Sequence, residues 1–562
     1  MKNKNDIINL LFLNLFAIIL LLIPGCKSKV DDIKKATNAG GATSADAGIQ
    51  ISEEEMQHAS NIYFDRCAGC HGATRKGATG PSLLPDGDGK FPSTKGLGAA
   101  GLRVFIENGT PKGMPEWKGI ISDSDIELLT RFLQVAPPAI PPLEMADIKK
   151  TWNLIVPIDQ RPTSPQHKRN IKNYFGVIMR DAGKVAIIDG DTKEKLAVLK
   201  TGFAVHILRP SASGRYFYSI GRDGKISMID LFPAEPQVVA EVKTAFDARS
   251  VDVSKYKGPK GDYLDKYIIG GGYNPSQFVI FDAQTLEPLS VTHTSGEACD
   301  GEKEFIEEAR VASIVASHTD PIWVVNVKET GMVWLVDYSD PVNPQVSKIP
   351  TARFLHDGGF ESTGKYFLVA ANANNKIVVI DVPNKKLESI VDVGKTPHPG
   401  RGANLKNKLG NLWATCHLGD NTVSFIKTDP GTDQWKVVKT STMPGNGGGS
   451  LFLKTHPKSK HLWVDRALNP DSTLNSAVYV FDVNTLDFKK TIQMPKGIHG
   501  RMVHLEYNVN GDEVWISVFM GRKSALLVYD DKTLQLKKIF DEPWVENPTG
   551  KFNVNNTVAD IY

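Results

Sequence analysis

The chain has 562 residues, more than one hydrophobic core usually serves, so two or more domains are expected. Hydrophobic residues make up 41% and charged residues 23% of the sequence, values typical of a soluble globular protein. The formal net charge of +3 is close to balance and argues against a nucleic acid or strongly acidic partner.

The first 26 residues have the pattern of an export signal. Lys2 and Lys4 precede an apolar run, residues 10–23, that is short for a membrane-spanning helix. The run leads to Gly25 and Cys26, which resemble a lipoprotein cleavage box; a plain signal peptide or an uncleaved anchor also fits. We therefore expect export to the periplasm, with lipid attachment at Cys26 left open.

Two helices and a proline-rich stretch outline the first folded domain. Residues 27–50 are small, polar and rich in Gly and Ala, and predict a flexible tether. Ser52 and Glu55 predict a capping box that starts one helix, and Ser122 starts another with apolar residues on one face. We expect a small all-α domain over 51–142 and, after the proline-rich stretch, a linker over 143–169.

From about residue 170 the sequence changes to short apolar strands separated by turn residues. Eight similar segments, such as VAIIDG at 185–190 and IVVIDV at 377–382, recur at intervals of about 40 to 55 residues. Their strands end at Asp189, Asp230, Asp282, Asp337, Asp381, Lys427, Asp482 and Asp530. The interval is the length of one four-stranded blade, whereas a β-sandwich would not repeat a hairpin segment at this spacing. The sequence predicts an all-β, eight-bladed β-propeller over 170–562, with a ligand at one end of its central channel.

The helical domain contains the motif CxxCH, the attachment site of a c-type haem. The thiols of Cys67 and Cys70 form thioethers with the haem, which places the imidazole of His71 under the iron. A thioether on the other side raises the potential, and Met114, in a Gly/Pro loop, is the expected second ligand. Met56 is expected to pack in the core. A haem with both axial positions filled only moves electrons, so substrate chemistry is expected in the propeller.

Histidines and arginines gather in turn-rich segments of the propeller. The histidines are His206, His356 and His398. The arginines are Arg180, Arg209, Arg222, Arg249 and Arg401. A single residue of either kind is usually structural or a surface charge, but several near blade junctions favour a site on the channel. Guanidinium groups pair with carboxylates in bidentate fashion, so this set suits a flat ligand that carries carboxylates.

The same segments carry a family resemblance. Residues 201–231, 352–359, 396–404 and 548–557, together with 62–80 around CxxCH, resemble cytochrome cd1 nitrite reductase. The resemblance runs in order from about residue 52 to 562. It implies a propeller with non-covalent haem d1, a haem c domain that delivers electrons, and usually a homodimer. The implied reaction is the one-electron reduction of nitrite to nitric oxide and water, with a periplasmic cytochrome c or cupredoxin as donor.

The resemblance also implies roles for single residues. His206 would be the proximal ligand of haem d1, and His356 and His398 would face the substrate. The residues expected to line the macrocycle are Arg180, Arg209, Arg222, Arg249, Ser250, Tyr273, Ala312, Arg401, Thr549 and Phe552. Because nitrite is an anion that loses one oxygen as water, two imidazoles protonated near neutral pH would both attract it and supply protons.

Two features depart from the family's pattern. The family often has a distal tyrosine ahead of the c domain, but residues 27–62 contain none, so the resting haem d1 is expected to be open, capped by water or closed by another group. His58 is a conceivable cap but more simply a helix-surface residue. Where glutamine is common in the family this chain has His504, which would contact the haem d1 edge, donate a proton or pack.

Two rival functions fit the same domain order. One is a haem d1 biosynthesis protein that oxidises a haem d1 precursor, and the other is a non-catalytic propeller that binds haem or partners. The paired segments around His356 and His398 favour the reductase.

Overall fold

A computed structural model describes residues 49–77, 80–89, 91–110, 114, 116–137, 143–301 and 303–562. The chain divides into two compact units, 1–139 and 140–562. The export signal, Cys26 and the tether up to residue 48 lie outside the described residues. Among the helices that are described, none has the length and apolar character that crossing a membrane requires.

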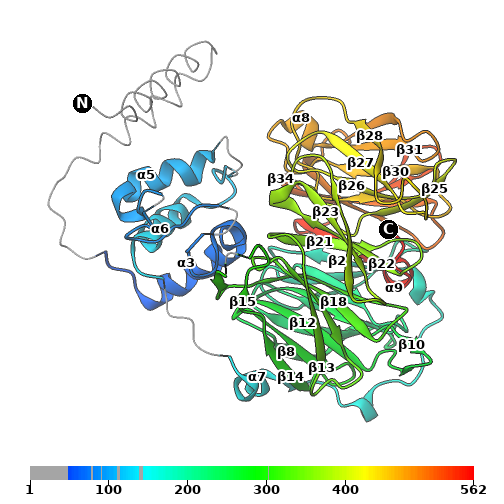
Figure 1. The fold of residues 1–562 in the computed structure, drawn as a ribbon, viewed down its shortest axis with the longest axis horizontal. Coiled ribbons are helices and arrows are strands. Elements are labelled where there is room, and N and C mark those ends of the chain that lie inside the picture. The colour runs from blue at the N-terminus through cyan, green and yellow to red at the C-terminus, as the bar shows by residue number, and fades with distance from the viewer. Residues whose placement is uncertain are drawn as a thin grey trace. The chain divides into compact units, whose positions relative to one another are not determined.

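The first unit is helical (Figure 1). Its helices are α3 (Glu53–Arg66), α4 (Ala68–His71), α5 (Thr94–Asn108) and α6 (Asp123–Gln134). The predicted capping box starts α3, because the Ser52 hydroxyl accepts from the backbone N–H of Glu55 at 3.2 Å and the Glu55 carboxylate accepts from that of Ser52 at 2.9 Å. Ser122 caps α6 in the predicted place. The all-α prediction for this unit is confirmed.

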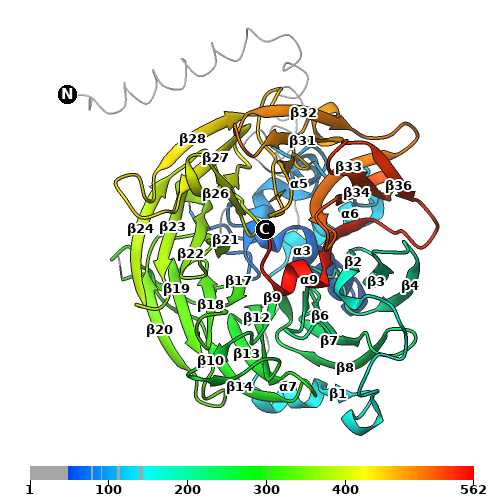
Figure 2. The ribbon, with the colours of Figure 1, turned by 90° about the vertical axis from the view of Figure 1, so that its right-hand side faces the viewer.

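The second unit is a ring of eight antiparallel sheets, which confirms the predicted eight-bladed propeller (Figure 2). Blades 1 to 4, each from its first to its fourth strand, are β37 (Pro548–Asn553), β2 (Tyr174–Met179), β3 (Lys184–Asp189), β4 (Lys195–Lys200); β5 (Ile207–Pro210), β6 (Tyr216–Ile220), β7 (Lys225–Asp230), β8 (Gln237–Lys243); β9 (Asp247–Val253), β12 (Tyr267–Asn274), β13 (Gln277–Asp282), β14 (Pro288–His293); and β17 (Val311–Ala316), β18 (Ile322–Val327), β19 (Met332–Asp337), β20 (Gln345–Pro350). Blades 5 to 8 are β21 (Leu355–Phe360), β22 (Tyr366–Ala371), β23 (Lys376–Asp381), β24 (Lys386–Asp392); β25 (Ala403–Asn407), β26 (Gly410–Cys416), β27 (Thr422–Lys427), β28 (Val437–Thr442); β29 (Leu453–Lys454), β30 (His461–Asp465), β31 (Ala477–Asp482), β32 (Phe488–Gln493); and β33 (His499–Tyr507), β34 (Glu513–Lys523), β35 (Ala525–Asp530), β36 (Leu536–Phe540).

The propeller also contains short elements outside the eight four-stranded blades. They are two hairpins, β10 (Lys257–Gly258) with β11 (Gly261–Asp262) and β15 (Gly296–Glu297) with β16 (Phe305–Ile306), the helices α8 (Ser472–Asn475) and α9 (Val554–Val558), and three 3-10 turns, η1 (Ile158–Gln160), η2 (Ile171–Asn173) and η3 (Asn372–Asn374).

The repeated sequence segment is the third strand of each blade, as its terminal residues show. The terminal carboxylate stabilises the turn that follows. In blade 3, for example, Asp282 Oδ1 accepts from the backbone N–H groups of Gln284 and Thr285, both at 2.9 Å. This local hydrogen bonding is the reason why the same residue type recurs at the same place in seven of the eight segments.

The ring closes where β37 pairs with β2, with Phe552 opposite Gly176. The side-chain amide of Asn553 also donates to Asn173 Oδ1 at 3.1 Å, across 380 residues of sequence. Blade 8 packs on blade 1 through Trp515 and Phe175, whose rings stack with their centroids 4.0 Å apart. The propeller is therefore held shut by a strand pair and an aromatic contact rather than by a covalent link.

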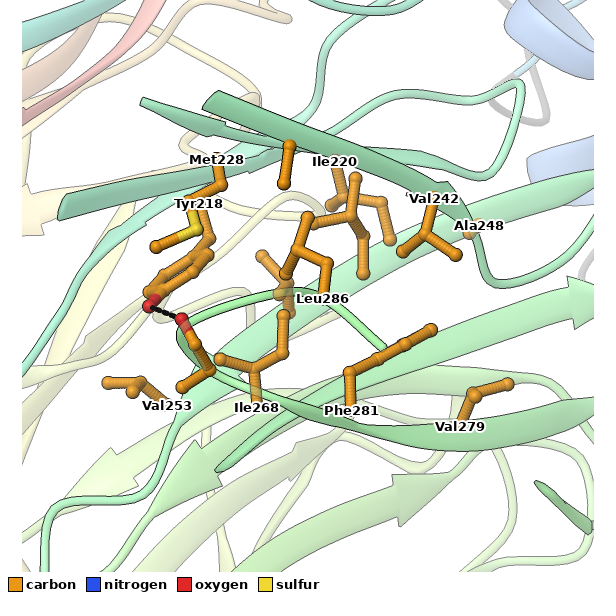
Figure 3. Packing of buried hydrophobic residues seen from close by; sticks show 14 of the residues in the cluster. Tyr218, Ile220, Met228, Val242, Ala248, Val253, Ile268, Val279, Phe281 and Leu286 are labelled. Atoms are coloured by element: carbon orange, nitrogen blue, oxygen red, sulfur yellow. Dashed lines mark hydrogen bonds between the residues drawn. The ribbon is translucent and has the colours of Figure 1, made fainter. Parts of the chain in front are cut away.

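The core of the propeller lies between neighbouring blades. Figure 3 shows one cluster, in which Tyr218 and Met228 of blade 2 pack against Ile268 and Phe281 of blade 3. The Tyr218 hydroxyl donates to the carbonyl of Ala283 at 2.7 Å, so its buried polar atom is satisfied. Burying each large apolar side chain contributes about 1.5–3 kcal/mol, which makes the blades a rigid support for the channel.

Residues 143–169, expected to form a linker, pack on the propeller instead. They contain α7 (Met145–Thr151) and β1 (Asn153–Leu154), and β1 pairs with β8 as a fifth strand of blade 2. Ile148 is fully buried in the cluster of Figure 3. The Arg161 guanidinium donates to the carbonyls of Val156 at 2.9 Å and Gln284 at 2.7 Å.

Candidate active site

Most of the predicted site residues of the propeller lie on or next to the first strand of a blade, whereas Arg180 and Arg222 follow second strands and Tyr273 lies on one. First strands of neighbouring blades contact one another around the axis, as β5 does with β9 and with β37. The strand residues are Arg209 on β5, Arg249 and Ser250 on β9, Ala312 on β17, His356 on β21, His504 on β33, and Thr549 and Phe552 on β37. His206 directly precedes β5, and His398 and Arg401 precede β25.

His356 and His398 lie together, with ring centroids 4.9 Å apart. Asp357 lies between them: its Oδ1 is 3.2 Å from His356 Nδ1, and its Oδ2 is 3.5 Å from His398 Nε2. The Nδ1 of His398 donates to the carbonyl of Leu451 at 2.8 Å, which leaves Nε2 facing the carboxylate. Two imidazoles and one carboxylate thus form a single cluster.

Asp357 was missed by the sequence analysis although it directly follows His356. On a regular strand, adjacent side chains point to opposite faces, so His356 and Asp357 would not meet. The pairing of β21 with β22 shifts register between Leu355 and Gly358, which is a β-bulge. The bulge brings both side chains to one site. The only signal in the sequence is the pair of glycines after Asp357, since glycine in a strand often marks such an irregularity.

Burial changes the charge of this cluster from the one the sequence suggested. It lowers the pKa of His356 to about 4, even though Asp357 opposes that shift. Burial also opposes the ionisation of Asp357, but the imidazoles of His356 and His398 outweigh it and hold the pKa of this carboxyl below its ordinary value. Burial therefore favours the neutral ring of His356 in the free site, whereas the sequence analysis expected imidazoles protonated near neutral pH.

His206 contacts Arg249, whose Nε donates to His206 Nε2 at 3.0 Å. Arg249 also donates from Nη1 to the hydroxyl of Tyr273 at 3.3 Å. Burial first, and then Arg249, Arg180 and Arg222, lower the pKa of His206 well below its ordinary value. The imidazole is therefore neutral, the form that binds iron.

Three arginines around the axis have buried nitrogens that no described residue satisfies, namely Arg209 Nε, Arg222 Nε and Arg401 Nη1. Two of the three also pair with a carboxylate through another nitrogen: Arg222 Nη2 lies 2.6 Å from an oxygen of Asp247, and Arg401 Nη2 lies 3.5 Å from one of Asp252. A buried donor without a partner costs about 1–3 kcal/mol. These donors fit the carboxylates of a flat ligand, as the sequence predicted for haem d1.

Three other predicted lining residues have structural contacts in the propeller. Ser250 Oγ accepts from the backbone N–H of Ile314 at 2.8 Å and so ties β9 to β17. The carbonyl of Thr549 accepts from Ser517 Oγ at 2.7 Å. Ala312 is buried on β17.

His504 and His58 have different environments. The His504 ring packs edge-on between Phe452 and Phe552, at centroid distances of 4.7 and 5.2 Å. Burial lowers the pKa of His504 well below its ordinary value, which favours packing or an edge contact over proton donation. His58 Nε2 lies 2.7 Å from Asp125 Oδ1 on the exposed surface of the helical unit.

In the helical unit, Cys67 directly precedes α4, Cys70 lies on α4, and His71 at the end of α4 is buried. His71 Nδ1 donates to the carbonyl of Pro81 at 2.8 Å, which orients the ring and leaves Nε2 for a metal. A Cβ on Gly80 would lie 3.0 Å from His71 Cε1. Glycine at position 80 therefore lets the backbone pass close to the imidazole. These features fit a covalent haem. Met114 and Met56 both pack against the core of this unit.

Comparisons with known proteins match both units. The Cytochrome D1 heme domain family matches residues 169–557, and the family of cbb3-type cytochrome c oxidase subunit III matches 54–133. A nitrite reductase of Stutzerimonas stutzeri is 48% identical over 551 residues, 93% of this chain and 97% of the relative. A dihydro-heme d1 dehydrogenase of Pseudomonas aeruginosa is 27% identical over 503 residues, 89% of this chain and 94% of the relative. The solved structure of dihydro-heme d1 dehydrogenase NirN in complex with DHE has a TM-score of 0.67 at 27% identity and covers 88% of this chain and 99% of its own. Two units in this order, with an eight-bladed ring and this level of identity along nearly the whole length, place the chain in the cytochrome cd1 nitrite reductase family.

Proposed function

We propose that this chain is a dissimilatory nitrite reductase, which converts nitrite, one electron and two protons into nitric oxide and water. The observation that carries the proposal is the cluster of His356, Asp357 and His398, whose potential ligand atoms all lie within 4.8 Å of one another. The cluster belongs to a d1 haem domain, and the relative in Stutzerimonas stutzeri is named nitrite reductase.

Haem c and haem d1 are the cofactors that the two matched domains imply. Cys67 and Cys70 would hold haem c covalently, with His71 as an iron ligand, and His206 would hold haem d1. When bound, the two haems supply the electron and the iron at which nitrite binds. The unpaired nitrogens of Arg209, Arg222 and Arg401 would receive the carboxylates of haem d1.

The chain's own contribution to the reaction is the handling of protons. Both protons must reach one oxygen of nitrite, and the adjacent imidazoles of His356 and His398 provide two donors. One ring can donate while the other holds the anion. Asp357, ionised between them, stabilises whichever imidazole carries a proton.

The test is turnover of nitrite by the full-length protein carrying both haems. Reduced protein mixed with nitrite should release nitric oxide, measured with an electrode, and its spectrum should contain the broad red absorption of haem d1. Protein that is fully loaded with haem d1 and releases no nitric oxide would contradict the proposal.

The dehydrogenase of Pseudomonas aeruginosa has a similar length and supports a second candidate function, oxidation of a haem d1 precursor. The same preparation should therefore be incubated with dihydro-haem d1. Formation of haem d1 without nitrite turnover would favour this function. If the protein shows neither activity, that result would favour a non-catalytic haem-binding propeller.

Met114 is our proposed second ligand of haem c. Replacing Met114 with alanine should lower the midpoint potential of haem c and abolish the sulfur-to-iron absorption band, because a thioether stabilises the reduced iron. The matched control is Met56→Ala, which removes a methionine from the same core. An unchanged potential and band in Met114→Ala would reject the assignment.

The proposed location is the periplasm, with a cytochrome c or cupredoxin as electron donor and a homodimer as the assembly. Whether Cys26 tethers the protein can be tested by growth with labelled palmitate. Lipidation predicts label in the wild type and none in Cys26→Ala. Unlabelled protein whose N-terminus lies at Lys27 or later would exclude a lipid anchor while agreeing with export.

A further inference from the structure

Asp465 is a fully buried carboxylate at the end of β30 in blade 7. Its side chain accepts hydrogen bonds from three backbone N–H groups. Its Oδ1 accepts from Leu451 at 2.7 Å and from Phe452 at 3.1 Å, and its Oδ2 accepts from His504 at 3.0 Å. The carboxylate thus fixes the chain just before β29 and joins it to β33 in blade 8.

One of these bonds leads directly to His398. The N–H of Phe452 and the C=O of Leu451 belong to the same peptide group. The N–H donates to Asp465, and the C=O accepts from His398 Nδ1 at 2.8 Å. A carboxylate that binds the N–H both sets the plane of the peptide and polarises it, which makes the carbonyl a stronger acceptor.

The backbone around this peptide is also held by other bonds, since the carbonyl of Phe452 accepts from the N–H of Asp465 at 3.1 Å and the N–H of Ser450 donates to the carbonyl of His417 at 3.2 Å. The Asp465 side chain adds the bonds to the N–H groups of Leu451 and Phe452, next to the carbonyl that His398 contacts. The peptide group also sets the position of the Phe452 ring, which lies edge-on to His398 at a centroid distance of 6.0 Å.

We propose that Asp465 is a positioning residue for His398, acting through the Leu451–Phe452 peptide. It holds the tautomer in which Nδ1 carries the hydrogen, so that Nε2 faces Asp357 and the substrate. The proposal deepens the proposed nitrite reductase function and rests on it for the role of His398, but the tautomer itself does not depend on that function.

The first experiment is a double-mutant cycle on the enzyme that carries both haems. Asp465→Asn keeps the shape of the side chain but removes its charge and one acceptor. It should lower nitrite turnover per haem d1 by about tenfold in the otherwise wild-type enzyme, and by less than about twofold in the His398→Ala background. Equal losses in the two backgrounds would overturn the proposal, because a general structural role does not require His398.

The matched control is Asp531→Asn, which alters another buried carboxylate that joins blades 7 and 8. Asp531 accepts from Trp463 Nε1 at 2.9 Å and from the Tyr507 hydroxyl at 2.8 Å, with no bond to the Leu451–Phe452 peptide. The turnover per haem d1 of the Asp531→Asn enzyme should stay near that of the wild type. A loss equal to that of Asp465→Asn would count against a specific role.

A second experiment measures the tautomer and needs no turnover. In the full chain, labelled with ¹⁵N-histidine and purified without haem d1, the His398 signals are those missing from His398→Ala. The wild type should show hydrogen on Nδ1, and Asp465→Asn should shift the ring toward the Nε2–H form. A wild-type ring with hydrogen on Nε2, or an unchanged ring in the variant, would overturn the proposal. If Asp465→Asn does not fold, Asp465→Ser takes its place, since its hydroxyl can still accept one N–H.

These outcomes separate the two proposals. A tautomer shift in a protein whose wild type does not turn over nitrite would refute the nitrite reductase function and leave the positioning role intact. Nitrite turnover with no tautomer shift would do the reverse.

Discussion

Replacing either His356 or His398 with alanine should lower nitrite turnover per haem d1 by about 10²–10⁴-fold, the usual contribution of general acid catalysis. Each ring removed takes away one of two proton donors that lie 4.9 Å apart in the same cluster. Steady-state nitric oxide release, with both haem contents measured on the same samples, gives the effect per loaded site.

The control separates this loss from damage to the fold. His461 is also buried, on the second strand of blade 7, and its Nδ1 donates to the carbonyl of Asp531 at 2.8 Å. His461→Ala should cost stability or yield but leave turnover per haem d1 close to normal. A His356 or His398 variant that keeps near-normal turnover per haem d1 is not an acid in this reaction.

The charge of the free cluster also predicts a pH dependence. Because burial lowers the pKa of His356 to about 4, the ring enters the reaction neutral, next to the ionised Asp357. Binding of the anion is expected to be coupled to protonation of this cluster, and one proton per nitrite means that KM for nitrite rises about tenfold for each pH unit between the free pKa of about 4 and the higher pKa of the nitrite complex. The slope should disappear when His356 and His398 are both replaced, and a slope that survives would assign the proton to another group.

His206→Ala should retain haem c and lose most haem d1, which would abolish turnover. Even the loss of an outer partner of a metal ligand typically weakens binding by about 10–100-fold, so the loss of the ligand itself should cost at least that much. The ratio of haem d1 to haem c absorbance in purified protein measures the occupancy. Added imidazole should restore part of the binding, because it can occupy the space left by the ring.

Full haem d1 occupancy in His206→Ala, with an unshifted spectrum, would contradict this assignment. Haem c must stay at the wild-type level in the same samples, since Cys67 and Cys70 belong to the other unit. A joint loss of both haems would point to misfolding rather than to a missing ligand.

The fold could be predicted from the sequence wherever its signals are local. An apolar strand that ends in Asp282 and turns on that carboxylate is such a signal, and so is the capping box at Ser52. Helix α5 has a local signal at its start, the N-cap Ser93, but Gly96, Gly98 and Gly101 lower its helix propensity and Gly98 has a φ of 63°. The sequence predicts a linker at the α7 segment because its contacts are with strands far along the chain, β8 and β14.

The site residues could likewise be predicted only where their signals are local in the sequence. His356 and His398 could be predicted because each stands in a distinctive short segment. Asp357 could not be placed beside them, since the bulge that turns it depends on how β21 pairs with β22. Asp465 is further from prediction, because its partners Leu451 and His504 precede and follow it by many residues and meet it only through backbone atoms.

The closing strand β37 has a consequence for biogenesis. It carries Thr549 and Phe552 to the axis while it completes blade 1 against β2, a strand that a nascent chain makes much earlier. Until β37 docks, blade 1 has an open edge and the haem d1 pocket lacks part of its wall. Insertion of haem d1 is therefore expected to follow ring closure, so that the cofactor enters a completed propeller rather than one whose first blade still lacks a strand.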